Sequence, residues 1–157
     1  MYLLLMLGLL LPQQSDAEKQ VHQQVTEFAK SFYTSFENGD SEKLFSMSMS
    51  HWYHDGQSII STSDVLRSEL RKFVEQRDTK NGKRVPEVKM VSSYGVMKAR
   101  MTTKDRELLE QVVKDDDYLA LVMLKPAVGV ARKSDNVVLL VRIKDGKASA
   151  IGVKHTQ

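Results

Sequence analysis

Residues 51–56, the segment His-Trp-Tyr-His-Asp-Gly, hold the side chains best suited to proton transfer. If this segment is extended, His51 and Asp55 share one face and His54 lies on the other. A carboxylate beside an imidazole can hold the ring in one tautomer, which suits acid–base catalysis. We therefore predict Asp55 as a general base, supported by His51 or His54. The alternative is a partly exposed strand end that closes in an ordinary turn.

The sequence gives little support for a metal site, a reactive cysteine or a serine hydrolase. The chain has no cysteine, which excludes disulfides, thiolate ligands and a cysteine nucleophile. His51 and His54 would point to opposite faces of a strand, so they do not make a pair of metal ligands. The three aspartates at 115–117 lack the spaced ligands and glycine of a calcium loop, and no Gly-x-Ser-x-Gly motif occurs. We predict neither a metal nor another cofactor.

Several aromatic residues suit a ligand pocket. Apolar rings with polar tips are typical of cavities that bind small molecules. Tight packing in a core explains the same residues equally well. The predicted ligand-binding set consists of Phe32, Trp52, Tyr53, Tyr94 and Tyr118.

A long amphipathic helix must position these groups. From Val21 to Phe36 the apolar residues recur at steps of four, three, four and four, which is the period of one helix face. Asn38-Gly39 predicts the end of this helix, because both residues tolerate a left-handed backbone. Asp40 or Ser41 can then cap a short second helix.

The rest of the chain predicts a third helix and then mostly strands. Residues 51–60 have an extended pattern, and Ser61, Thr62 or Ser63 can cap the third helix. Asp145-Gly146 lies between two apolar runs, which is a strong hairpin signal. The periodicity predicts strands at 88–90, 94–101, 118–124, 136–143 and 148–154, with a helix inserted near 102–114.

This order of elements predicts an α+β fold. Three N-terminal helices would pack in the concave face of a curved, mostly antiparallel sheet, with the one inserted helix near 102–114. A doubly wound parallel sheet is disfavoured, because strands and helices do not alternate and no glycine-rich phosphate loop follows a strand. Strand 118–124 is apolar on both faces, so the inserted helix or a second subunit must cover its outer side.

The length and the first residues predict one exported domain. The 157 residues suffice for a real core. Residues 2–11 form an apolar run that is too short to span a bilayer. With Ser15-Asp16-Ala17 this run predicts a signal peptide, 1–17, and a single secreted or periplasmic domain, 18–157. One departure from the signal-peptide pattern is that no Lys or Arg precedes the apolar run. The alternative interpretation is an uncleaved N-terminal anchor.

The charge distribution argues against nucleic acid as a partner. The formal net charge is +3, and charges of both signs are interspersed. Basic residues cluster only at 80–84, where no aromatic residues interleave with them. This segment therefore predicts a solvated loop.

The chain resembles the nuclear-transport-factor-2-like superfamily, also called the cystatin-like α+β cone, and in particular its small secreted bacterial members. The resemblance covers residues 18–155, and the inserted helix departs from it. It implies a conical half-barrel with a pocket at its wide end. The residues that carry it are the stripe Phe28–Phe36, the helix end Glu37-Asn38-Gly39-Asp40, Leu44-Phe45, residues 52–56 and the hairpin at Asp145-Gly146.

The same resemblance bears on catalysis. Members similar to ketosteroid isomerase place a catalytic aspartate where Asp55 falls. The helix-one tyrosine of that branch would align with Phe32, which has no hydroxyl. Tyr33 follows directly but is turned by one helical step onto a different face. The catalytic pair that the resemblance implies is therefore incomplete.

Three functions remain open. The leading hypothesis is a secreted, non-catalytic domain that binds a small apolar or amphipathic molecule, or a protein partner, and dimerises through the outer face of the sheet. The second is an isomerase, dehydratase or cyclase that uses Asp55 as base with His51 or His54 in support. The third is a structural adaptor whose core is completely filled.

Overall fold

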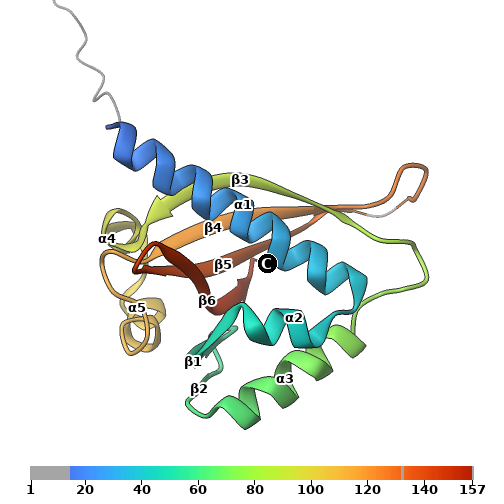
Figure 1. The fold of residues 1–157 in the computed structure, drawn as a ribbon, viewed down its shortest axis with the longest axis horizontal. Coiled ribbons are helices and arrows are strands. Elements are labelled where there is room, and N and C mark those ends of the chain that lie inside the picture. Colours follow the sequence, from blue (N-terminus) through green and yellow to red (C-terminus); the bar gives the residue numbers. More distant parts are fainter. Residues whose placement is uncertain (1–14, 132, 157) are drawn as a thin grey trace, which may run out of the picture.

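Six strands form one curved sheet that packs against a long N-terminal helix (Figure 1). The computed structural model describes residues 15–131 and 133–156. The strand order is β2-β1-β6-β5-β4-β3, and each neighbouring pair is antiparallel except β1 and β6, which are parallel. The predicted α+β class and mostly antiparallel sheet are confirmed. The strands are β1 (Ser48–His54), β2 (Ser58–Ile60), β3 (Val85–Ser93), β4 (Tyr118–Lys125), β5 (Asp135–Lys144) and β6 (Lys147–His155).

Helix α1 (Asp16–Asn38) begins and ends at capping residues. The Ser15 hydroxyl accepts the backbone N–H of Glu18, and the Glu18 carboxylate accepts the N–H of Ser15. At the other end Gly39 adopts a left-handed φ of 81°, as the Asn-Gly pair predicts. The predicted signal peptide lies mostly outside the described residues. Cleavage after Ala17 would remove the Ser15 cap.

The inner core lies between the helices and the concave face of the sheet. Helices α2 (Ser41–Ser46) and α3 (Ser63–Glu75) complete the helical layer beside α1. Every second residue of a strand faces this layer, which is the strand period. Burying large side chains here contributes most of the stability of the fold. The largest fully buried side chains of this core are Trp52, Tyr33, Phe32, Leu44, Leu66 and Leu139.

A second, smaller core covers the outer face of the sheet. The segment between β3 and β4 packs there with Leu109, Val112 and Val113 against Leu140 of β5 and Ile151 of β6. Its helices are α4 (Tyr94–Met97), the 3-10 turn η1 (Lys98–Arg100) and α5 (Thr103–Leu109). The inserted helix therefore covers the outer side of the apolar strands at this end.

The predicted strand at 94–101 is wrong. Strand β3 ends at Ser93, and the backbone N–H groups of Tyr94 and Gly95 bond to carbonyls of Asp117 and Asp115. These bonds turn the chain out of the sheet, so the alternation of residues 94–101 has no partner strand. The inserted helix is also shorter than predicted, because it ends at Leu109 and turns follow.

Strand β1 departs from simple alternation. His51 has φ 62°, and the pairing with β6 shifts register between Ser48 and Tyr53. After this irregularity Trp52 faces the inner core and Tyr53 the outer core. His51 and Asp55 therefore do not form one continuous face.

No helix in the described part of the chain is both long and apolar enough to cross a membrane.

Candidate functional site

Two adjoining cavities form a cleft at one end of the molecule. Their volumes are about 330 Å³ and about 490 Å³, and they share Phe36, Phe73, Arg84 and His155. These residues come from the end of α1, from α3, from the segment before β3 and from the end of β6. The first cavity also contacts Tyr33, Leu124, Asp135, Asn136 and Val137, and the second His54, Asp55, Gln57, Arg77 and Asp78.

Phe36 and Phe73 form the apolar wall of the cleft. Their ring centroids are 4.4 Å apart, so the two rings hold each other in place. Phe36 is almost fully buried, whereas Phe73 is half-buried and presents more of its ring to the cleft. The wall therefore offers an aromatic surface to an apolar ligand.

Tyr33 lies against the inner part of the first cavity. Its side chain is buried, and its hydroxyl oxygen has no hydrogen-bond partner among the described residues. Burial raises the pKa of Tyr33 well above its ordinary value, although the nearby Arg84 guanidinium opposes the rise. The phenol therefore stays protonated and is a hydrogen-bond donor that the fold leaves unused.

Asp55 contacts His155 through both carboxylate oxygens. Oδ1 accepts the backbone N–H of His155 at 2.7 Å, and Oδ2 lies 3.1 Å from Nδ1 of its ring. A carboxylate only accepts hydrogen bonds, so this contact favours a proton on Nδ1 of the ring. Asp55 is held by its own N–H, which bonds to the carbonyl of Val153 at 2.9 Å. Asp55-Gly56 forms the β1–β2 turn with φ values of 48° and 74°.

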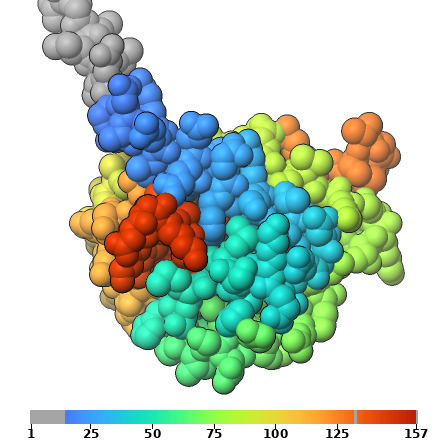
Figure 2. Space-filling model, in the orientation of Figure 1, coloured from blue at the N-terminus to red at the C-terminus, as the bar shows by residue number. Residues whose placement is uncertain are grey.

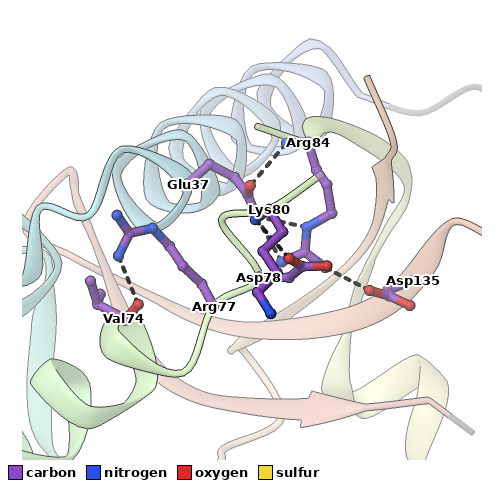
Figure 3. A network of polar contacts seen from close by, with 7 residues as sticks. All are labelled: Glu37, Val74, Arg77, Asp78, Lys80, Arg84 and Asp135. Atoms are coloured by element: carbon purple, nitrogen blue, oxygen red, sulfur yellow. Dashed lines mark hydrogen bonds and ion pairs between the residues drawn. The ribbon is translucent and has the colours of Figure 1, made fainter. Parts of the chain in front are cut away.

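A buried ion-pair network borders the cleft (Figure 3). The Glu37 carboxylate accepts from Arg84 Nε at 2.8 Å and from the Arg84 backbone N–H at 2.9 Å. Arg84 Nη1 donates to Asp135 Oδ2 at 2.6 Å. Glu37 is 5% exposed, so its pair with Arg84 joins the end of α1 to the start of β3 away from solvent, whereas Asp135 at the start of β5 is 44% exposed. It fixes the position of Arg84 in the cleft.

A hydrogen bond also holds the first half of α1. Gln24 Nε2 donates to the carbonyl of Gly146 in the β5–β6 turn at 2.6 Å. Figure 2 shows this turn, in red, beside the blue half of α1. Helix α1 is thus tied to the sheet in its first half and at its end.

The predicted catalytic residues separate in the structure. Asp55 and His54 line the second cavity, but the partner of Asp55 is His155. His51 is exposed and lines neither cavity of the cleft. The positive φ of His51 breaks the alternation on which the predicted pairing rests.

The predicted ligand-binding residues also lie elsewhere. Trp52 stacks on Phe32, with ring centroids 6.3 Å apart, and borders only a space of about 10 Å³. Tyr53 and Tyr94 belong to the outer core, and Tyr118 contacts the ring of His22. None of these five residues lines the cleft. Core packing, the alternative stated above, accounts for Phe32, Trp52, Tyr53 and Tyr94.

Sequence reasoning missed Tyr33, Phe73, Arg84 and His155 as cleft residues. Tyr33 lies three and four residues before Phe36 and Glu37, so helical spacing could have grouped it with them. Nothing in the sequence spacing pairs His155 with Asp55. Among the described residues, no three His, Asp or Glu side chains are placed to hold a metal ion.

Comparisons with known proteins identify the fold. The sequence matches no family model and no curated protein. The structure is similar to a protein of unknown function with a cystatin-like fold from Nostoc punctiforme, with a TM-score of 0.55, 15% identity, and coverage of 90% of this chain and 91% of that one. It is similar to a protein named Rd1NTF2_05, with a TM-score of 0.50, 12% identity, and coverage of 90% and 100%. It is also similar to a protein from Catenulispora acidiphila in complex with S-DNPA, with a TM-score of 0.50, 15% identity, and coverage of 87% and 94%. The chain thus has the cystatin-like, nuclear-transport-factor-2-like fold that its sequence indicates.

Proposed function

We propose that this chain binds a small, neutral, amphipathic molecule in the cleft between the end of α1, α3 and the end of β6. The observation that carries the proposal is an aromatic wall at one cavity of about 330 Å³, which Tyr33 also borders with its buried, unpaired hydroxyl close behind the surface. Cavities of about this size that combine apolar surface with placed polar groups are typical small-molecule sites.

The charges of the cleft favour a neutral ligand. Arg84 is already paired with Glu37 and Asp135, and Asp55 is paired with His155. In the first cavity an ionic ligand would have to displace one of these partners, which costs free energy that a neutral ligand does not need. The Tyr33 hydroxyl instead favours a ligand with an acceptor such as a carbonyl oxygen.

The concave shape favours a small molecule over a protein partner. A cleft bordered by rings and polar side chains can enclose part of a small ligand, whereas protein partners generally need a broad surface. The complex of the Catenulispora acidiphila protein with S-DNPA supports a small-molecule site on this fold. The Asp55–His155 contact favours a second candidate function, acid–base catalysis on the bound molecule.

Phe73→Ala tests the site. The probe is prodan, a neutral naphthyl ketone whose fluorescence reports an apolar environment. Removing the half-buried ring should weaken prodan binding about tenfold, because about 1.4 kcal/mol of apolar contact is lost. The measurement is a fluorescence titration of the full chain, with the thermal midpoint followed at saturating prodan.

Phe45→Ala is the matched control. Phe45 is also half-buried, but it lies on α2 under Arg67 and lines neither cavity of the cleft. Its loss should leave prodan affinity unchanged. Equal effects of the two substitutions, or no saturable binding to the unmodified chain, would refute the proposed site.

A further inference from the structure

We infer that the cleft is also catalytic, with His155 as the general base and Asp55 as the residue that positions it. This inference rests on the proposed ligand-binding function of the same cleft. It reverses the roles expected from the sequence, in which Asp55 itself takes the proton. The reason is that the two side chains differ in which of their polar atoms already have partners.

Both oxygens of Asp55 already contact His155. Oδ1 accepts the backbone N–H at 2.7 Å, and Oδ2 lies 3.1 Å from Nδ1 of the ring. The remaining ring nitrogen, Nε2, has no hydrogen bond among the described residues, and it holds the free lone pair when the proton of the neutral ring is on Nδ1. Both oxygens of the Asp55 carboxylate therefore already have a partner, and the base with an available lone pair is His155.

The position of His155 suits contact with a ligand. It lines both cavities, and its side chain is 48% exposed, whereas that of Asp55 is 29% exposed. The ring of Phe73 packs edge-on against the imidazole, with centroids 6.2 Å apart. The Asp55 contact at Nδ1 and the aromatic contact thus orient the ring, and the backbone bond holds the residue, while the edge at Nε2 stays open to the cleft.

Charged groups surround this pair from several elements. Arg84 and Asp135 face it across the first cavity, and His54, Arg77 and Asp78 border the second. Arg84 is neutralised by Glu37 and Asp135, so it does not compete for the Asp55 carboxylate.

The open cleft favours water as the second reactant, and the substrate class that we assign is a small neutral ester. Nε2 removes a proton from a water molecule, and the resulting hydroxide adds to the ester carbonyl carbon. The bond from that carbon to the alcohol oxygen then breaks, and the departing alkoxide takes the proton from the imidazolium. The products are a carboxylic acid and an alcohol, and the neutral ring is restored. Tyr33, in the same cavity, is a donor suited to the carbonyl oxygen.

The test is hydrolysis of para-nitrophenyl acetate by the full chain, followed by the release of nitrophenolate. His155→Gln should lower the rate about 100-fold, to that of the uncatalysed reaction, because general-base catalysis contributes about this much. Asp55→Asn should lower kcat about tenfold with KM unchanged, because the ring loses its fixed tautomer. Asn is chosen because it tolerates the left-handed backbone of this turn.

His51→Asn is the matched control. His51 is exposed, also has a positive φ, and lines neither cavity of the cleft. Its substitution should leave the rate unchanged. Hydrolysis by the unmodified chain no faster than by an equal concentration of free imidazole would overturn the inference, as would equal loss in the His51 and His155 variants.

Nitrogen NMR supplies a readout that a merely structural role would not change. The unmodified chain should show His155 as a single tautomer with its proton on Nδ1, and Asp55→Asn should show a mixture. A mixture in the unmodified chain would contradict the positioning role.

Prodan titration separates the two proposals. Saturable binding without ester hydrolysis would overturn the catalytic inference and leave the proposed binding function standing. Absence of saturable binding would refute both. If His155→Gln misfolds and loses prodan binding, the inference is tested by the kinetics and the NMR spectrum of Asp55→Asn. An unchanged kcat or an unchanged tautomer in Asp55→Asn would then overturn it.

Discussion

At the scale of single residues, Tyr33 is the side chain whose state is hardest to reconcile with a filled core. A buried hydroxyl without a partner costs about 1–3 kcal/mol, and the structure contains it beside a cavity rather than beside an acceptor. The third hypothesis, an adaptor with a completely filled core, therefore accounts poorly for this position.

Tyr33→Phe separates the stability of the free protein from its affinity for ligand. Removing an unsatisfied hydroxyl should leave the free energy of unfolding unchanged or raise it by up to about 1 kcal/mol. Prodan affinity should fall about tenfold, because the ligand carbonyl loses its donor. Urea denaturation measures the first quantity and fluorescence titration the second.

Tyr94→Phe is the control for this prediction. The Tyr94 hydroxyl is also buried, but it bonds to Glu110 Oε1 at 3.2 Å and lies outside the cleft. Its removal should destabilise the protein by about 1 kcal/mol and leave prodan binding unchanged. Equal destabilisation by the two substitutions would show that the Tyr33 hydroxyl has a partner after all.

At the scale of elements, the position of the cleft depends on how α1 is attached to the sheet. Glu37 is in the last turn of α1, and Arg84 comes directly before β3. Their contacts span 47 residues of sequence. Figure 3 shows Glu37 above and Asp135 to one side of the Arg84 guanidinium, so one side chain links three elements.

Glu37→Gln should therefore destabilise the whole fold. Arg84 would keep Asp135 but lose its buried carboxylate partner, which should cost about 3 kcal/mol. Glu42→Gln is the control: Glu42 pairs with Arg67 on the surface, and its loss should change stability by no more than about 0.5 kcal/mol. Urea denaturation compares the two. A small, equal effect of both substitutions would contradict a structural role for the buried pair.

At the scale of the whole molecule, the outer face of the sheet is only partly covered. The inserted segment packs over Leu140 and Ile151, whereas Met90 of β3 stays 42% exposed opposite Leu121 of β4. Dimerisation through this face stays a prediction. The structure limits the predicted interface to the exposed strip around Met90.

Met90→Glu tests that prediction. A charge in the middle of an apolar interface should disfavour association, because the carboxylate would lose its hydration without gaining a partner. Sedimentation velocity should show a dimer for the unmodified chain and a monomer for the variant. Val96→Glu is the control, since Val96 is 64% exposed and lies on α4. A monomer in both proteins would end the prediction.

Local rules were sufficient for the elements that the sequence predicted correctly. The end of α1 at Gly39, the Asp40 cap of α2 and the hairpin at Asp145-Gly146 each depend on neighbours in sequence. The order of helices and strands then limits the fold to the α+β class. Asp55 was also found by its local pattern, and it lies in the cleft.

The tertiary structure alone decided what Asp55 contacts. The parallel pairing of β1 with β6 brings together residues 100 positions apart, and a pairing at that distance leaves no periodic signal in the sequence. The cleft forms where the ends of α1, α3, β5 and β6 come together, and no periodic signal in the sequence predicts that meeting either. Side-chain spacing along one element reports which face is buried, but only the packing of several elements determines which residues meet at their ends.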